Sequence, residues 1–351
     1  MLDPEPAGPA VSWRYKEAVP RRPLSKRVTL EEVARAAGVS RATVSRVVNG
    51  VTSVDESIRA AVEEAISMTG YLPNLAARSL VTRRADAVAL VLPQEGRVLG
   101  DPFFGRVVRG VMTVTAPSGL HLVLTITGAG TREQVVTDLK RGRLDGVILI
   151  HTEPADPLPG WLVNAHFPVV LSARPTTPLA ITYVDVNQTA GAGLAARHLQ
   201  RSGRHRLATI AGPQDTPAGQ DRLTGFRAAV GADVPWVEGD FTMQSGALAM
   251  ERLLAAHPDV DGVFVASDLM AQGAIPVLRR EGRHVPTDVA IVGFDDSSAA
   301  LDCDPPLTTV RQPTEEMAAE MARLLVRQIE HPETPVSAVV FEPSLVVRRS
   351  A

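Results

Sequence analysis

Two short helical patterns with a glycine between them, in residues 29–49, constrain the fold of this chain more than any other feature. In the first pattern, apolar residues recur at the spacing of one helix face: Leu30, Val33, Ala34 and Ala37. Thr29, with Glu32 three residues later, has the sequence of a capping box and predicts the helix start. Gly38 can adopt the left-handed conformation that ends a helix, and Ser40 can cap the next one.

The second pattern predicts a helix with two chemically different faces. Its inner face is apolar, with Val44, Val47 and Val48, whereas its outer face carries Arg41, Ala42, Ser45, Arg46 and Asn49. Two short helices joined by a glycine-containing turn, the second with a basic outer face, are typical of a helix-turn-helix. Arginine can donate two parallel hydrogen bonds to guanine, while Ser, Thr and Asn reach phosphates or base edges. The alternative is an ordinary solvated helix. DNA binding is favoured because the helix caps, the glycine turn, the inner valines and the polar outer face all agree with it.

The flanking segments extend this module. A third helix that closes the core is predicted by its apolar spacing: Ile58, Ala61, Val62, Ala65 and Ile66. Asp55 can cap that helix and Gly70 can end it. Residues 74–80 look helical but are far too few to form a stable lone helix in water. Residues 1–26 hold five prolines and little periodicity, which predicts a disordered N-terminal arm.

From Ala87 onward, short apolar runs alternate with amphipathic helical patterns. The expected strands are residues 88–92, 122–124, 146–150, 169–171, 207–210, 262–265 and 289–292. This alternation predicts parallel sheets covered on both faces, and the region is long enough for two lobes. Ligands of such folds bind at the carboxyl ends of strands, here in the cleft between the lobes.

Charge is distributed unevenly over the chain. The net charge is −3, but residues 26–84 carry nine Lys/Arg and six Asp/Glu. A basic module on an acidic body indicates that only the module meets nucleic acid. The single cysteine, Cys303, excludes an internal disulfide framework, and there is no apolar run of transmembrane length and no signal peptide. We therefore expect a cytoplasmic protein without membrane contact, and the scattered histidines predict no metal site and no cofactor.

Three motifs resemble those of a known family. They are the segments Val28–Ala34 and Ala37–Ser40, then Ala42–Asn49, with further similarity through Gly70–Leu80. The chain resembles the LacI/GalR family of bacterial transcription regulators. The resemblance implies an α/β fold: an all-α helix-turn-helix headpiece (27–73), a hinge helix and linker (74–85), and a two-lobed core (86–351) with parallel sheets, similar to periplasmic binding proteins. Lobe 1 would span about 86–185 and 314–341, and lobe 2 about 187–311 and 342–351.

The resemblance also implies a function. The chain would bind a pseudo-palindromic double-stranded operator as a homodimer, and it would act as a repressor controlled by a small-molecule effector, a carbohydrate. The absence of a heptad tail favours a dimer over a tetramer. In the family the hinge helices pair in the minor groove, where Leu80 matches a residue that wedges between base pairs. The DNA-contacting residues would be Thr29, Ser40, Arg41, Ala42, Thr43, Ser45, Arg46, Asn49, Tyr71, Asn74, Ala77 and Leu80.

Six residues are candidate effector contacts. Arg222, Asp268 and Asp295 lie at or beyond the ends of predicted strands, where ligands of such folds bind, and Phe104, Phe241 and Gln312 match cleft-lining positions of the family. Carboxylates and a guanidinium can bind sugar hydroxyls in pairs, and an aromatic face can stack on the ring. Each has a purely structural alternative, such as a cap, a salt bridge or a core position. Two departures, Ala173 where many sugar-responsive members carry Asp and Asn187-Gln188 in place of Asp-Asn, leave the effector open.

Two other classes of protein compete with this hypothesis. An enzyme is disfavoured because the chain has no nucleophile elbow, no phosphate-binding loop and no metal-ligand cluster. A secreted solute-binding protein would explain the core but not the helix-turn-helix. Whether the effector releases DNA or promotes binding stays open.

Overall fold

The computed structural model of the chain describes residues 28–48, 51, 53–71, 84–93, 101–128, 130–150 and 156–351. The chain forms two compact units, Met1–Arg78 and Ser79–Ala351. The predicted N-terminal arm and the predicted hinge helix at 74–80 lie outside the described residues. Within the described ranges, none of the helices combines the length and the apolar character that a membrane span requires.

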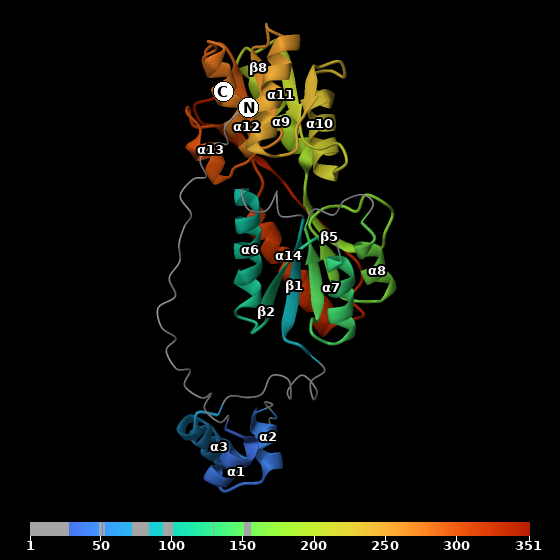
Figure 1. Cartoon of the computed structure of the whole chain (residues 1–351), viewed down its shortest axis with the longest axis vertical. Helices are drawn as coiled ribbons and strands as arrows, with labels where there is room; N and C mark the ends of the chain where they lie inside the picture. The colour runs from blue at the N-terminus through green and yellow to red at the C-terminus, as the bar shows by residue number, and fades with distance from the viewer. Residues whose placement is uncertain are drawn as a thin grey trace, which may run out of the picture. The chain divides into compact units, whose positions relative to one another are not determined.

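The first unit, hereafter the headpiece, has the three predicted helices in its described part: α1 (Leu30–Ala37), α2 (Arg41–Val48) and α3 (Glu56–Thr69) (Figure 1). Thr29 and Glu32 form the predicted capping box, with the Thr29 amide donating to Glu32 Oε2 at 2.7 Å. Gly38 ends α1 in the left-handed conformation, at a φ of 67°. The inner faces enclose one apolar core: Val33, Ala34, Val44, Val47, Val62, Ala65 and Tyr71.

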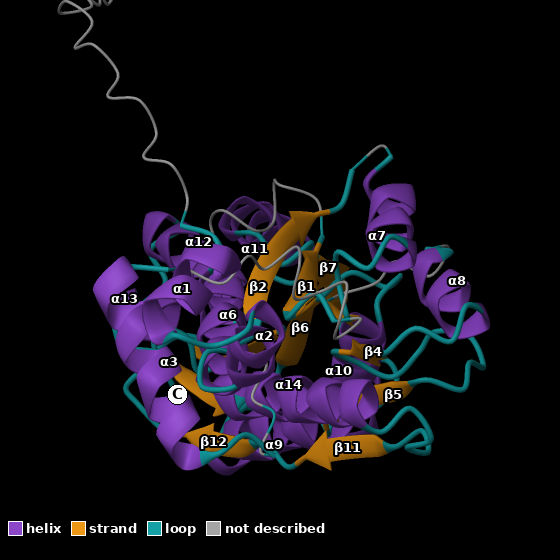
Figure 2. Ribbon diagram, turned by 90° about the horizontal axis from the view of Figure 1, so that it is seen from below, coloured by secondary structure: helices purple, strands orange, loops and turns teal. Residues whose placement is uncertain are grey.

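The second unit, hereafter the core, contains two six-stranded sheets. Figure 2 shows strands of both sheets in orange, among the purple helices that cover them. The first sheet has the order β11-β5-β4-β3-β1-β2, and all its strand pairs are parallel. Its strands are β1 (Ala87–Leu92), β2 (His121–Ile126), β3 (Gly146–Leu149), β4 (Val169–Leu171), β5 (Thr182–Val186) and β11 (Ala338–Phe341). We call this sheet and its helices lobe 1.

Helices cover both faces of the lobe 1 sheet. Along β1, Val88, Leu90 and Leu92 pack in one apolar cluster with α6 (Pro102–Thr115) and α14 (Thr314–Glu330). The alternate residues, Ala87, Ala89 and Val91, pack with α7 (Thr131–Lys140) and α8 (Leu158–Asn164). Every residue of β1 is therefore buried, as expected for a parallel strand between two helix layers.

Lobe 2 is built in the same way around the second sheet, of order β12-β10-β9-β8-β6-β7. Its strands are β6 (Leu207–Ala211), β7 (Trp236–Glu238), β8 (Gly262–Val265), β9 (Ala290–Asp295), β10 (Thr308–Arg311) and β12 (Ser344–Val346). One face packs against α9 (Gln188–Arg201) and α10 (Pro217–Val230). The other packs against α11 (Met243–Ala256), α12 (Asp268–Arg280) and α13 (Ser298–Asp302).

The strand pattern differs from the sequence prediction in two ways. Strands β5, β7, β10, β11 and β12 were not predicted, because each has only three to five residues and all but β11 contain a polar residue. In addition, β12 pairs with β10 antiparallel, whereas parallel sheets were expected. The chain leaves β11 in lobe 1 and enters β12 in lobe 2 after only Glu342 and Pro343. Ser344 therefore lies beside Arg311 at the carboxyl end of β10, and β12 runs back along that strand in the opposite direction.

Candidate functional site

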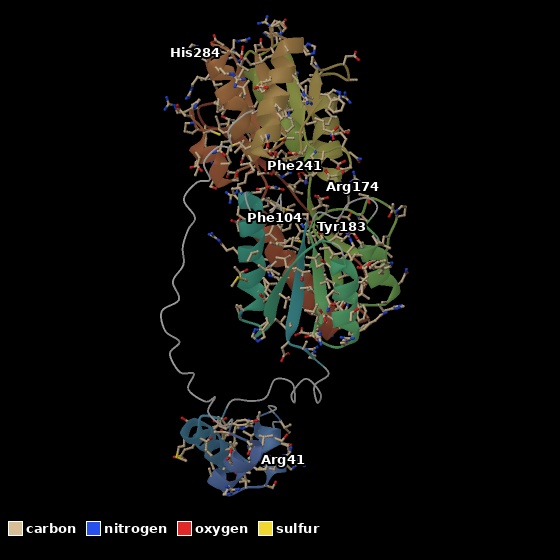
Figure 3. The ribbon with its side chains drawn as sticks, in the orientation of Figure 1. Arg41, Phe104, Arg174, Tyr183, Phe241 and His284 are labelled. Carbon is tan, nitrogen blue, oxygen red and sulfur yellow. The ribbon has the colours of Figure 1, made fainter. Side chains whose placement is uncertain are left out.

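The outer face of α2 is open to solvent, as expected for a helix that meets DNA. Arg41, Ala42 and Arg46 are exposed, and Thr43 and Ser45 are partly buried. Arg41, labelled in Figure 3, forms an ion pair with Glu31 of α1, with Nε and Oε1 2.9 Å apart. Both side chains are more than half exposed, at 68% and 55%, so the pair contributes little and is easily exchanged for DNA.

Besides Thr29, which caps α1, Ser40 and Tyr71 among the proposed DNA contacts have structural roles. Ser40 Oγ accepts a hydrogen bond from the Thr43 amide at 3.1 Å and so caps α2, as predicted. Tyr71 is only 7% exposed and packs inside the headpiece core, so its ring is not an open DNA-facing surface. The remaining expected contacts, Asn49, Asn74, Ala77 and Leu80, lie outside the described residues.

The core contains a cavity of about 1100 Å³ that both lobes line. Its lining residues follow the carboxyl ends of strands, as in Leu149 and Leu171 of lobe 1 and Asp295 of lobe 2. Phe104 from α6 and Phe241 from the loop after β7 line the same cavity from the two lobes (Figure 3). Phe241 is partly buried and offers an apolar ring to a bound molecule, whereas Phe104 is 4% exposed and also belongs to the apolar cluster of lobe 1.

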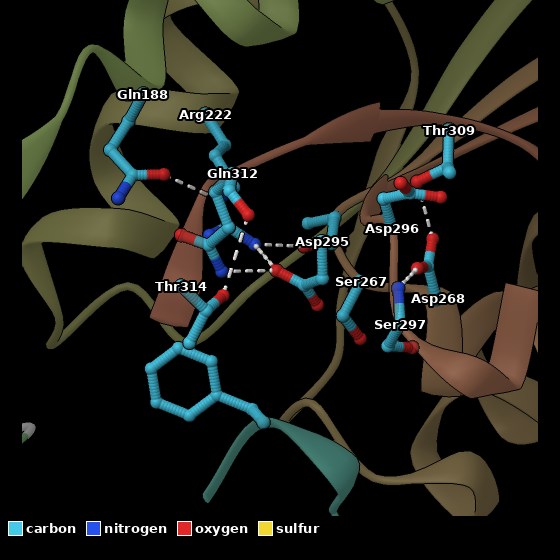
Figure 4. Close-up of polar contacts among 12 residues, drawn as sticks. Gln188, Arg222, Ser267, Asp268, Asp295, Asp296, Ser297, Thr309, Gln312 and Thr314 are labelled. Carbon is cyan, nitrogen blue, oxygen red and sulfur yellow. Dashed lines mark hydrogen bonds and ion pairs between the residues drawn. The ribbon is translucent and has the colours of Figure 1, made fainter. Parts of the chain in front are cut away.

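Three of the expected effector residues meet at one wall of this cavity. Arg222 of α10 donates from Nη1 to Asp295 Oδ1 at 3.4 Å, and Gln312 donates from Nε2 to the same oxygen at 2.7 Å (Figure 4). Arg222 Nε also donates to Gln188 Oε1 at 2.8 Å. The guanidinium lies over the ring of Phe294, with Cζ 3.7 Å from its centroid. These contacts hold a buried arginine, 4% exposed, in one orientation.

This arrangement leaves hydrogen-bonding capacity directed at a ligand. Within the described part of the chain, Arg222 Nη2 and Asp295 Oδ2 make no hydrogen bond, although both residues line the cavity. One is a charged donor and the other a strong acceptor. A vicinal pair of hydroxyl groups, which can accept from one group and donate to the other, satisfies both at once.

Backbone strain is concentrated at the same wall. Asp295 has a φ of 115° and Asp296 one of 53°, and Phe241, whose ring centroid lies 5.7 Å from Arg222 Cζ, has a φ of 69°. Such conformations are unfavourable for residues with a side chain and persist where the surrounding contacts impose them, which is common at ligand sites. Burial raises the pKa of Asp295 to about 7, and the nearby charge of Arg222 opposes that rise. Burial also lowers the pKa of Arg222.

Asp268 does not face the cavity in this structure, although the sequence analysis placed it among the effector contacts. It is fully buried; its Oδ1 accepts from Thr309 Oγ1 at 2.5 Å and its Oδ2 from the Ser297 amide at 2.8 Å (Figure 4). Its neighbours Ser267 and Leu269 line the cavity instead. The start of α12 directs the Asp268 side chain beneath the cavity wall. There Asp268 holds the segment that follows Asp295.

Several cavity residues were missed by the sequence analysis. Asp101 caps α6 by accepting from the Phe103 amide at 2.9 Å, and burial raises its pKa. The Asp-Pro sequence before α6 signalled the cap but not the cavity. Gln188 was noted only as a departure from the family, yet it orients Arg222. The described residues include no group of three or more His, Cys, Asp or Glu side chains that could hold a metal ion.

Comparisons with known proteins agree with this architecture. Residues 29–74 match the family described as bacterial regulatory proteins, lacI family, and residues 196–351 match a periplasmic binding protein-like domain. The HTH-type transcriptional regulator CelR of Thermobifida fusca is 45% identical over 335 residues, covering 93% of this chain and 98% of CelR. The HTH-type transcriptional repressor CytR of Escherichia coli (strain K12) is 32% identical over 332 residues, covering 92% and 96%.

Two solved structures extend the comparison. The CelR–cellobiose complex is 43% identical, covers 93% of this chain and 100% of that chain, and has a TM-score of 0.72. The lac repressor dimer bound to operator and the anti-inducer ONPF is 25% identical, covers 93% and 99%, and has a TM-score of 0.81. The predicted family and fold class are thereby confirmed. The chain belongs to the lacI family of bacterial regulatory proteins and is a DNA-binding transcriptional regulator with a two-lobed effector core.

Proposed function

We propose that this regulator is a repressor whose operator affinity is set by a neutral carbohydrate bound in the core cavity. The observation that supports this most directly is that one cavity wall carries both Arg222 Nη2, a donor, and Asp295 Oδ2, an acceptor, neither of which has a hydrogen-bond partner among the described residues. Sugar hydroxyls on adjacent carbons fit such a pair, and Phe104 and Phe241 offer rings for the apolar sugar face.

The charge of the cavity favours a neutral sugar over a sugar phosphate. The charged side chains among its lining residues are those of Asp101, Asp215, Asp240, Asp295, Arg174 and Arg222. Arg174 is already paired with Asp221, with Nη2 and Oδ1 2.7 Å apart. The remaining balance is negative and would repel a phosphate.

The size of the cavity favours a sugar of more than one ring. A volume of about 1100 Å³ lies just above the usual range for small-molecule sites, roughly 300–1,000 Å³. CelR was solved with cellobiose, which makes that disaccharide the first probe. We propose that the direct contacts of the sugar are Phe104, Arg222, Phe241, Asp295 and Gln312. Asp268 would support the wall through its hydrogen bond with the Ser297 amide.

On the DNA side, we propose that two copies bind a pseudo-palindromic operator. The recognition helix would present the exposed residues of α2, Thr29 and Ser40 would contact the backbone, and Asn74, Ala77 and Leu80 would act in the hinge. We propose that the second copy packs on lobe 1, where Met112, Val123 and Leu124 are apolar yet 49%, 41% and 53% exposed. A two-fold dimer would present two headpieces to symmetric half-sites.

We also propose that the bound sugar is released unchanged and that the protein acts in the cytoplasm, where its DNA is. The regulators CelR and CytR support a binding role rather than catalysis. Chromatography of cellobiose after incubation with the protein should show an unaltered sugar. Appearance of glucose would contradict the binding role.

The effector hypothesis is tested on an operator that the full-length chain selects from random DNA. Fluorescence anisotropy would follow this DNA while cellobiose, cellotriose, glucose or glucose 6-phosphate is added. We expect a neutral oligosaccharide to change operator affinity by about 5- to 150-fold, the usual range of coupling between two sites. No change with any neutral sugar, or a response to the phosphate alone, would overturn the proposal. Sedimentation of the complex as a monomer would overturn the dimer.

A further inference from the structure

We propose that Arg106 of lobe 1 is a positioning residue that ties the arrangement of the lobes to the ligand-binding carboxylate of lobe 2. The proposal rests on the effector cavity described above. Arg106 does not line that cavity. Its guanidinium instead meets the backbone of the residues that do.

Arg106 contacts the cavity wall through backbone carbonyl groups. Its Nη1 donates to the carbonyl oxygens of Asp295 at 3.0 Å and Asp296 at 3.3 Å, and Nη2 reaches that of Gln312 at 3.5 Å. Asp295 and Gln312 are the acceptor and the donor that meet at the wall. One side chain from α6 therefore holds both main-chain segments that carry this pair.

The guanidinium is itself fixed within lobe 1. Its Nε lies 2.9 Å from each carboxylate oxygen of Glu315 at the start of α14, and its side chain is 16% exposed. The two helices pack so closely that a side chain at Gly110 would lie 2.3 Å from the Glu315 carbonyl oxygen. Arg106 thus moves with lobe 1 as a rigid group.

The segment that Arg106 holds is strained and has other supports in lobe 2. Asp295 and Asp296 both have positive φ angles, of 115° and 53°. Asp268 accepts from the Ser297 amide at 2.8 Å, and Arg348 Nη2 lies 2.5 Å from Asp296 Oδ1. Those two supports belong to lobe 2, so they stay when the lobes move. Among these three supports, Arg106 alone changes with lobe position, and a strained segment responds to the loss of one support.

Movement of the lobes would break the contacts of Arg106 with lobe 2. When lobe 1 shifts relative to lobe 2, Arg106 leaves the carbonyl groups and the Asp295 segment can relax. A ligand that needs Asp295 in its strained position therefore favours the lobe arrangement seen here. The contact of Arg106 with the Asp295 segment thereby links the bound sugar to lobe 1, the lobe that follows the predicted hinge in the sequence.

The first test compares three full-length variants with the wild type by calorimetry, with cellobiose as the probe. Arg106→Met removes both the charge and the several N–H donors of the guanidinium, whereas Arg106→Lys keeps the charge but not that set of donors. Arg323→Met is the control. Arg323 is exposed and pairs with Glu320 on its own helix. We expect both Arg106 variants to bind cellobiose at least about fivefold more weakly and the control to bind normally.

The pH dependence of affinity separates positioning from general loosening. Asp295 is faced by Arg222 from α10, Arg106 from α6, Asp101 before α6 and Asp268 from α12. The charge of Arg106 lowers the pKa of Asp295, so Arg106→Met should move the pH at which binding weakens upward. Arg106→Lys should leave that pH nearly unchanged while still weakening binding. A loosened fold would weaken binding in both variants without this difference.

A second measurement does not depend on any sugar. Hydrogen exchange of the ligand-free protein would follow the amides of Asp296 and Ser297, with those of β8 as internal reference. We expect Arg106→Met to speed exchange at the two amides and not in β8. Wild-type protein that binds no sugar would refute the proposed effector but not this link. Unchanged exchange together with unchanged cellobiose affinity would overturn the role of Arg106.

Discussion

Replacing Asp295 by Asn should abolish most of the response to the effector while leaving operator binding intact. Asn keeps the size of the side chain but removes the negative charge that faces Arg222. Oδ1 already accepts from Gln312 and Arg222, so the lost group is the charged Oδ2 left for the ligand. Hydrogen bonds to charged groups contribute about 1.5–3 kcal/mol, so affinity should fall about 10- to 150-fold.

The pH dependence makes this prediction sharper. The pKa of Asp295 is about 7, so at about pH 8 the wild type carries the charge that Asn lacks. Below about pH 6 the wild-type carboxyl group is itself protonated, and the difference between the two proteins should shrink. Calorimetric titrations of cellobiose across this range, with operator affinity measured by anisotropy, check both points.

Stability should change in the opposite direction. A carboxyl group whose pKa is raised by folding binds its proton more tightly in the folded state, so stability falls as pH rises from about 4 to about 7. The Asp295→Asn variant does not lose stability in this way. Its free energy of unfolding should therefore rise relative to that of the wild type over this range, by a few kcal/mol in order of magnitude. Equal sugar affinity at about pH 8, or lost operator affinity without sugar, would refute the role of Asp295.

Three further predictions concern the headpiece. Arg41→Ala should cost about 1–3 kcal/mol at one base position, measured with a set of single-base operator variants, and a uniform loss on all sequences would instead mean a phosphate contact. Glu31→Gln should release Arg41 and tighten operator binding by up to about fivefold in a salt titration, since an exposed pair is worth at most about 1 kcal/mol, and weaker binding would contradict this. Gly38→Ala should destabilise the headpiece by about 1 kcal/mol or more, because a left-handed φ of 67° is unfavourable for a residue with a side chain even in open space. Hydrogen exchange of the α1 amides in urea would measure this loss, and unchanged exchange would show that the turn relaxes.

The headpiece shows how much local sequence can determine. The capping box at Thr29, the left-handed Gly38 and the cap at Ser40 depend on residues within four positions of one another, and all were predicted from their order. The valines of α2 face the core because their spacing matches the helix period. Tyr71 is the exception, since its burial depends on contacts with helices earlier in the chain.

The core shows where local sequence is insufficient. Fully buried apolar strands such as β1 and β8 were predicted, because a strand buried on both faces is recognisable from its own residues. The polar strand β5 and the antiparallel β12 become strands only through their neighbours in the sheet. Strand order and direction are decided by which edges remain free when the lobes assemble.

The effector site divides in the same way. Arg222 and Asp295 were expected from their places beyond predicted strands, and Gln312 from the family resemblance; the structure brings the three together. Only the tertiary structure decided that Asp268 lies beneath the wall rather than on it, because the turn at the start of α12 sets its direction. Only the tertiary structure revealed Arg106, which lies 189 positions before the Asp295 carbonyl group it holds. The sequence by itself determined local caps, periods and residue chemistry, while contacts between distant segments required the packed fold.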